Sequence, residues 1–219
     1  MERRRELLVV LLAVVSGATD AVGFISLGGS FTSVMTGNMV LLGLSAGQRN
    51  GDLAAHAAAA ILAFVIGVAV GTRIAGSPRE GDPVWPRAVT RALTVEYALF
   101  VAFAVGWEIT GGRPTADVTQ VALLALNAIA LGIQSATILR FGIPGLSTTY
   151  MTGTLTTAVA RLATGRRPSD VARQAEILGG LIFGAAIGAV IATHAIRFSP
   201  LLQLPLLSVV LVGARRISR

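Results

Sequence analysis

Six apolar stretches, each long enough to cross a lipid bilayer, account for most of the 219 residues of this sequence. At about 1.5 Å per residue, a helix of about 20 residues spans the roughly 30 Å hydrocarbon core of a membrane. Charged residues make up only 13% of the chain, whereas soluble domains carry about 25%. We therefore predict an all-α polytopic membrane protein, which forms a single integral membrane domain over residues 1–219 in contact with the lipid bilayer. The predicted spans are Leu7–Leu27, Leu53–Ile74, Ala88–Thr110, Val118–Leu139, Ala175–Ala192 and Phe198–Ala214.

The N-terminal stretch also has features of a secretory signal peptide, because Arg3–Arg5 precede an apolar run and small residues follow at Ser16–Ala18. The apolar run nevertheless continues to Leu27, which matches the thickness of a bilayer. We interpret it as the first transmembrane helix.

The composition excludes several kinds of chemistry. The chain has no cysteine, so disulfides, thiolate metal sites and a catalytic cysteine are excluded. All 18 basic residues are arginines that lie in short clusters between apolar runs, a pattern typical of membrane proteins and not of nucleic-acid-binding proteins. The two histidines, His56 and His194, belong to no metal-binding motif. We expect no cofactor, no metal and no nucleic-acid partner, and an intramembrane enzyme is the least favoured interpretation.

Two further apolar segments, Phe31–Gly47 and Pro144–Ala163, are rich in Thr, Ser and Gly and resemble each other. Residues 16–37 align without a gap onto residues 132–153, and both copies end in Met-Thr-Gly. Each segment follows one span and precedes another, so the chain divides into two halves, residues 7–110 and 118–214. Internal repeats of this kind are common in transporters.

The distribution of arginines favours a topology in which these two segments do not cross the membrane. If all eight segments spanned, 12 of the 18 arginines would lie on the cytoplasmic side. If both Met-Thr-Gly segments are re-entrant or broken helices, only Arg49, Arg113 and Arg197 lie outside and the other 15 lie inside. We therefore predict six spans with both termini in the cytoplasm, and three spans per half make the two halves inverted relative to each other.

Two re-entrant segments that enter from opposite sides would meet near the middle of the bilayer. Irregular backbone is tolerated there only inside protein or beside a water-filled cavity, and helix ends can bind a polar or ionic solute. We predict that such a site is lined by hydroxyl, amide and glycine groups of both segments. The candidate residues are Thr32, Ser33, Thr36, Gly37 and Asn38 from the first, and Thr148, Thr149, Tyr150, Thr152, Gly153 and Thr154 from the second.

The strings Ser16–Phe24 (SGATDAVGF), Phe31–Gly43 (FTSVMTGNMVLLG) and Gly145–Thr154 (GLSTTYMTGT) resemble the YoaK-like family of bacterial inner-membrane proteins, the domain-of-unknown-function family 1275 (DUF1275). The resemblance covers nearly the whole chain. It implies about six transmembrane segments and a location in the bacterial cytoplasmic membrane, and it implies no particular substrate.

Three polar residues within the predicted spans have both a functional and a structural interpretation. Asp20 and Glu96 are carboxyls at membrane depth, where a charge is costly. Asp20 is a candidate for solute binding or proton coupling, and Glu96 is a candidate for proton coupling. Asp20 could instead be a hydrogen-bonded packing residue, and Glu96 could form an ion pair with Arg91. Gln134 aligns close to Asp20 in the other half and either joins helices or contacts solute.

We predict a transporter or channel for a small polar or ionic solute, with a proton-coupled carrier as one form of it. The alternative is a structural or regulatory membrane protein without transport activity. A stripe formed by Gly180, Gly184 and Gly188 predicts close helix packing, either within the chain or in a homodimer.

Overall fold

The computed structural model describes residues 2–143, 148 and 150–217, and in these residues helices are joined by turns without any strand. Among the described residues, six helical segments are long and apolar enough to cross a membrane: α1, α3, α4, α5, α7 with η1, and α8 with η2. The predicted all-α protein with six spans is confirmed. The elements are α1 (Glu2–Ser26), α2 (Met35–Gln48), α3 (Gly51–Ala75), α4 (Arg87–Ile109), α5 (Asp117–Leu139), α6 (Met151–Ala163), η1 (Pro168–Val171), α7 (Ala172–His194), η2 (Ile196–Leu201) and α8 (Gln203–Ile217).

The largest departures from the predicted spans occur at the two ends of the chain. Helix α1 already begins at Glu2, so that Arg5 lies within it, buried, with its guanidinium 5.6 Å from the centre of the Phe141 ring. The last span is divided, because a short 3₁₀ helix containing Pro200 precedes α8. Pro205 falls in the first turn of α8, where a missing backbone N–H costs no helical hydrogen bond.

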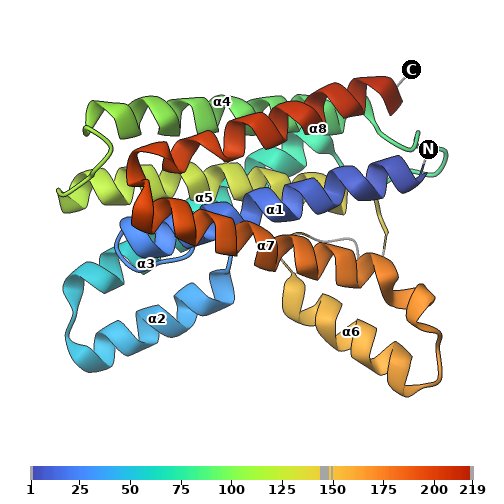
Figure 1. Cartoon of the computed structure of the whole chain (residues 1–219), viewed down its shortest axis with the longest axis horizontal. Helices are drawn as coiled ribbons and strands as arrows, with labels where there is room; N and C mark the ends of the chain where they lie inside the picture. Colours follow the sequence, from blue (N-terminus) through green and yellow to red (C-terminus); the bar gives the residue numbers. More distant parts are fainter. Residues whose placement is uncertain (1, 144–147, 149, 218–219) are drawn as a thin grey trace.

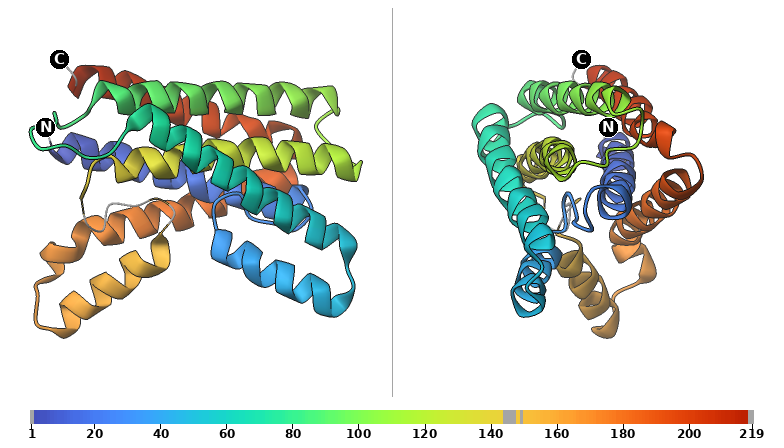
Figure 2. Two further views of the ribbon diagram at one scale, coloured as in Figure 1. Left: turned by 180° about the vertical axis from the view of Figure 1, so that it is seen from behind. Right: turned by 90° about the vertical axis from the view of Figure 1, so that its left-hand side faces the viewer.

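The spanning helices run roughly side by side, with α1 and α5 the most buried of the six (Figures 1 and 2). The ends of the chain lie at the same end of the bundle, together with the connection between α3 and α4 (Figure 1). The turn between α2 and α3 and the connection between α4 and α5 lie at the opposite end. This arrangement matches the six-span topology and not the eight-span one.

Glycines allow two pairs of spanning helices to pack with their backbones almost in contact. A Cβ atom on Gly184 of α7 would collide with the carbonyl of Val14 in α1, and one on Gly67 of α3 would collide with the carbonyl of Ile129 in α5. The predicted glycine stripe of α7 is therefore used to pack α7 against α1 within the chain. A homodimer would have to use a different surface.

Candidate functional site

The two Met-Thr-Gly segments form short helices, α2 and α6, that leave the bundle on the same side (Figure 1). Their N-terminal ends, at Met35 and Met151, converge near the middle of the molecule, and the helices diverge from there toward opposite ends (Figures 1 and 2). Between these N-terminal ends lies an open cavity of about 300 Å³. The structure thus brings together the two segments that the sequence predicted to share a site. The cavity is lined by Ser33, Val34, Met35, Thr36, Phe64, Ser135, Tyr150, Met151 and Thr152.

Within the two predicted segments, helix α2 begins at Met35 and helix α6 begins at Met151. The residues before α2 form an irregular loop that returns from the end of α1 to the cavity. Neither Val34 nor Tyr150, the residues that precede the two helices, caps its helix with a side-chain hydrogen bond. The N-terminus of a helix carries a partial positive charge, so both helix ends direct a positive dipole toward the cavity.

Asp20 holds the loop before α2 against the C-terminal part of α1. Its Oδ1 accepts hydrogen bonds from the backbone N–H of Thr32 (2.8 Å), from the Thr32 hydroxyl (2.8 Å) and from the backbone N–H of Ser33 (2.7 Å). Its Oδ2 accepts one from the Ser33 hydroxyl (2.6 Å). All three residues are buried. Asp20 therefore lies behind the cavity wall, where it positions Ser33, and is not itself a lining residue.

Asn38 closes the same loop from the other end. Its amide donates to the Phe31 carbonyl (2.7 Å) and accepts from the Phe31 backbone N–H (2.9 Å), in the manner of two paired strands. The Phe31 ring in turn stacks on Phe24 of α1, with ring centres 4.8 Å apart. Asn38 is fully buried, so it stabilises the loop and does not contact a solute in the cavity.

Gln134 has a similar role in the second half, although it lies two residues before Ala136, the residue that aligns with Asp20. Its amide nitrogen donates to the hydroxyl of Ser16 in α1 (2.8 Å) and to the hydroxyl of Thr148 (3.0 Å). Thr148 is buried, and Thr154 is buried one turn into α6 with its hydroxyl donating to the Tyr150 carbonyl (3.1 Å). Thr149 lies outside the described residues. The second segment is thus connected to α1 and α5 through an amide where the first uses a carboxyl.

Four of the predicted site residues reach the cavity: Ser33, Thr36, Tyr150 and Thr152. Gly37 and Gly153 are in the first turns of the two helices but do not line it. They leave room for neighbouring rings, because a Cβ on Gly153 would collide with the Tyr150 ring and one on Gly37 would lie 3.2 Å from Phe31.

An ion pair anchors the start of the segment that leads to α6. Arg140, the residue after α5, donates from Nη2 to Oδ1 of Asp82 (2.7 Å) and from Nε to the carbonyl of Ala75 at the end of α3 (2.8 Å). Hydrogen bonding to this guanidinium lowers the pKa of the Asp82 carboxyl, and the carboxyl in turn raises the pKa of Arg140. The pair joins the connection between α3 and α4 to the end of α5.

Comparison with known proteins agrees with this architecture. The model of the family described as "Protein of unknown function (DUF1275)" matches residues 8–214. This chain belongs to the DUF1275 family. It is also 37% identical over 151 residues to the UPF0700 transmembrane protein YoaK of Bacillus subtilis (strain 168), and the match covers 69% of this chain and 64% of that protein. The chain thus spans slightly less than two thirds of that relative, and no solved structure matches it.

In this DUF1275 protein the second predicted carboxyl, Glu96, is separate from the cavity. Its side chain is fully buried in α4, and neither oxygen has a hydrogen-bond partner among the described residues. The hypothesis of an ion pair with Arg91 is wrong, because Arg91 is exposed and the structure shows no ion pair of Glu96 with any described residue. In the described part of the chain, no three His, Asp or Glu side chains gather as a metal site.

Several residues of the candidate site were not indicated by any sequence pattern. Ser135 and Phe64 line the cavity from α5 and α3, and neither belongs to a polar segment. Ser16 was part of the aligned repeat, but its bond to Gln134 follows from helix packing. The ion pair between Asp82 and Arg140 joins two loops 58 residues apart.

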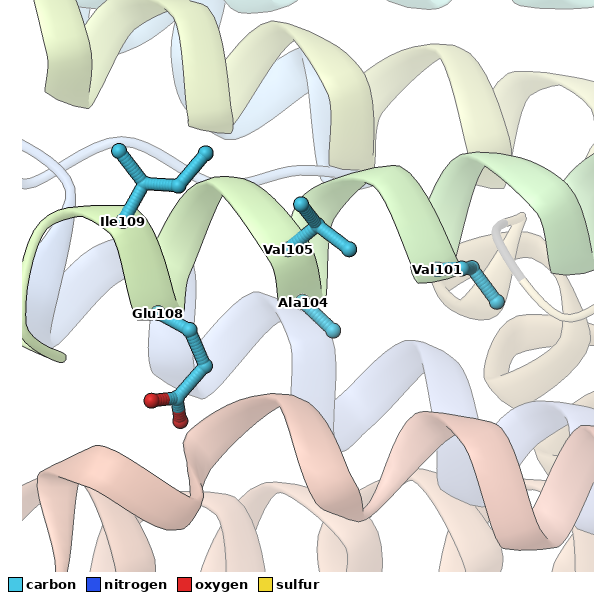
Figure 3. A pocket seen from close by; sticks show the side chains of 5 residues that line it. All are labelled: Val101, Ala104, Val105, Glu108 and Ile109. Carbon is cyan, nitrogen blue, oxygen red and sulfur yellow. The ribbon is translucent and has the colours of Figure 1, made fainter.

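A second hollow lies on the outer face of α4 and is not a comparable site. It measures about 500 Å³ and is almost entirely apolar (Figure 3). Its one charged residue, Glu108, points toward η2, where Arg197 donates to it at 3.3 Å (Figure 3). The exposed apolar side chains of this face are typical of a surface in contact with lipid. The lining residues are Val101, Ala104, Val105, Glu108 and Ile109.

Proposed function

We propose that this protein transports a small polar or ionic solute across the bacterial cytoplasmic membrane, with the cavity between α2 and α6 as its binding site. The observation that carries the proposal is the convergence of two helix N-termini on one cavity, beside a first loop that buried hydrogen bonds fasten to Asp20. In transporters, solute sites are commonly formed where two interrupted helices meet near the midplane. The arginine distribution supports cytoplasmic termini.

The helix packing supports two inverted halves. Under the alignment of the two segments, α1 corresponds to α5 and α3 corresponds to α7. If each helix is replaced by its counterpart in the other half, the α1–α7 pair becomes the α5–α3 pair. These two pairs have the most extensive helix–helix contacts of the described structure. Their close approach depends on glycines in both cases, such as Gly184 and Gly67. An inverted pair of halves would place each re-entrant segment on its own side of the membrane.

The lining narrows the chemistry of the solute. It contains five hydroxyl-bearing residues, of which the Ser33 hydroxyl already donates to Asp20, and none of the nine lining residues is charged. The five are Ser33, Thr36, Ser135, Tyr150 and Thr152. Helix N-termini favour anions, and hydroxyls can donate or accept. A neutral polar solute or a small anion fits this lining better than a metal cation does.

The first experiment is a thermal-shift screen of the purified protein against small inorganic anions and neutral polar metabolites, because a bound solute stabilises the folded state by mass action. Any stabilising compound is then titrated against Thr36→Val, Thr152→Val and Thr156→Val. Thr156 lies one turn beyond Thr152 in α6, is exposed, and does not line the cavity, so it is the matched control. We expect both lining variants to weaken binding by at least tenfold, and the control to bind as the wild type does.

Uptake into proteoliposomes then separates transport from binding alone. A compound that binds and accumulates supports the proposed function. A compound that binds through the same threonines but never crosses the membrane would favour the structural or regulatory alternative. Equal effects of Thr152→Val and Thr156→Val would place the solute elsewhere.

A further inference from the structure

Glu96 is a carboxyl in the central part of a spanning helix, and it has no compensating partner among the residues that the structure describes. It lies nine residues after the start of α4 and 13 before its end, or about 14 Å and 20 Å along the helix. It shares its buried face with Leu93, Phe100 and Phe103, and neither of its oxygens is hydrogen-bonded to a described residue.

No charged group of the described chain is placed to neutralise Glu96. The elements that pack against α4 are α3, α5, α8 and η2. The charged and titratable side chains of these four elements lie within about two turns of a helix end or in the short helix η2. They are Asp52, His56 and Arg73 of α3, Asp117 of α5, Arg197 of η2, and Arg215 and Arg216 of α8.

An unpaired carboxylate at this depth is expensive, by at least about 2.5–3.5 kcal/mol on insertion scales. The cost is avoided when the group carries a proton, since a neutral acid needs no counter-charge. Asp20 shows the contrasting arrangement, because four donors point at its two oxygens. The same protein therefore holds one buried carboxyl that is fully hydrogen-bonded and one that is not.

Glu96 lies at the depth of the amide that contacts the second re-entrant segment. In the antiparallel pair α4 and α5, Gly106 faces Leu123, where a Cβ would be 2.9 Å from the leucine side chain. Counting ten residues back along α4 and ten forward along α5 leads to Glu96 and Ile133, so Gln134 is within about 1.5 Å of the same level. Gln134 Oε1 is buried and has no described partner, whereas its amide nitrogen donates to Thr148.

We propose that Glu96 binds and releases a proton, and that its protonation state is transmitted through Gln134 and Thr148 to the start of α6 and thereby to the cavity. The coupling to transport rests on the proposed function. Protonation takes one H⁺ from water and yields a neutral acid, for whose O–H we propose the buried Oε1 of Gln134, at the same depth, as the acceptor. Release returns H⁺ to water and leaves a carboxylate, which requires the α4–α5 contact to open to water. If proton binding at Glu96 and solute binding in the cavity are coupled in this way, the protein is a proton-coupled carrier.

The proton site is tested without any solute by infrared spectroscopy in D₂O, with ¹³C-glutamate labelling to identify glutamate carboxyl bands. We expect a protonated-carboxyl band in the wild type that shifts on labelling, declines as the pH is raised, and is missing in Glu96→Gln. A band that never forms shows an ionised Glu96 and overturns the proposal. A band that persists at every pH at which the protein is folded shows a permanently neutral packing residue and overturns it equally. If Glu96→Gln does not fold, the labelled wild type still decides, because the other five glutamates lie in terminal helical turns or loops.

The link between Glu96 and the cavity is tested with the variant Thr152→Cys. Its thiol is the only one that can be labelled, because the chain has no native cysteine. Its rate of maleimide modification is compared with that of a cysteine at Asn50, in the turn between α2 and α3, which corrects for the pH dependence of the thiol itself. We expect the ratio of the two rates to change at least twofold over the pH range in which the Glu96 band titrates, and to stay constant in the Glu96→Gln background. If the ratio is independent of pH in both the wild-type and the Glu96→Gln backgrounds, the proposed link between Glu96 and the cavity is wrong. Neither measurement uses a solute, so failure of the proposed transport function would leave both results interpretable.

Discussion

Replacement of Asp20 should separate the mechanical role of this carboxyl from the role of its charge. The side chain holds Thr32 and Ser33 with four hydrogen bonds, and Oδ1 accepts three of them. In Asp20→Ala the two hydroxyls can rotate toward other acceptors, but the two backbone N–H groups cannot. Each buried donor without a partner costs about 1–3 kcal/mol, so we expect a loss of about 2–6 kcal/mol.

Asp20→Asn should behave differently, because the amide has nearly the same shape. Its oxygen can take the place of Oδ1 and keep three hydrogen bonds, and its nitrogen can donate to the Ser33 hydroxyl after that hydroxyl turns. The weaker neutral hydrogen bonds are offset by removal of a charge that costs about 2.5–3.5 kcal/mol at membrane depth. We therefore expect the stability of Asp20→Asn to lie within about 1 kcal/mol of the wild type.

The measurement is a melting curve of each purified variant in the same detergent. For a chain of this size, 1 kcal/mol corresponds to a shift of about 2–4 °C, so Asp20→Ala should melt at least about 4 °C below the wild type. Thr137→Ala in α5 is a control for loss of a buried hydroxyl, because the Thr137 hydroxyl donates to the Ile133 carbonyl of its own helix. Wild-type stability of Asp20→Ala, or equal loss in Asp20→Ala and Asp20→Asn, would refute the assignment of Asp20 as the anchor of this loop. If Asp20→Asn is stable and yet inactive in uptake, the charge itself takes part in transport.

Three further changes test the packing, the loop ion pair and the topology. Gly184→Ala should cost about 1–3 kcal/mol by overpacking α7 against α1, whereas Gly179→Ala, with open space around it, should leave the melting temperature unchanged. Because Arg140 lowers the pKa of Asp82, their pair stabilises the fold above the ordinary aspartate pKa of about 4, and this contribution disappears as the pH falls through the lowered value. When the pH is lowered, the melting temperature of Asp82→Asn should therefore fall less than that of the wild type. A cysteine at Ser77 should react with an impermeant maleimide only from the cytoplasmic side; labelling from outside would contradict six spans with cytoplasmic termini.

The spans and the two polar segments were predictable because each depends on local composition. A bilayer requires about 20 apolar residues per helix, and the six stretches of that length in the sequence are the six candidate spans of the structure. The repeated Met-Thr-Gly motif is also a local sequence feature, and it marks the start of both short helices. Their first turns begin at the Met in both halves, four and seven residues later than the start of the polar segment. Composition alone does not distinguish an irregular polar loop from a polar helix.

The roles of individual side chains could not be predicted, because they depend on contacts between helices. Asp20 and Asn38 lie in the predicted site, but their partners place them behind the wall of the cavity. The sequence suggested an ion pair between Glu96 and Arg91 from their spacing along one helix. Five residues in a helix correspond to a rotation of about 500°, so that the two side chains face different directions and Arg91 is exposed while Glu96 is buried.

The two halves are similar in the segments that form the cavity and different in the residues that hold those segments. Asp20 aligns with Ala136, and Gln134 aligns with Ala18, so neither anchor is present in both halves. The first loop is fastened by four hydrogen bonds to a carboxyl, whereas the described part of the second is joined to Gln134 by a single bond at Thr148. Gln134 also lies at the depth of Glu96, which has no hydrogen-bond partner among the described residues. Glu96 has no counterpart in the other half, since position 212 is a valine. A passive pore has no need for this asymmetry. In a coupled carrier it is useful, because one firmly held segment can define the solute site while the other responds to the proton.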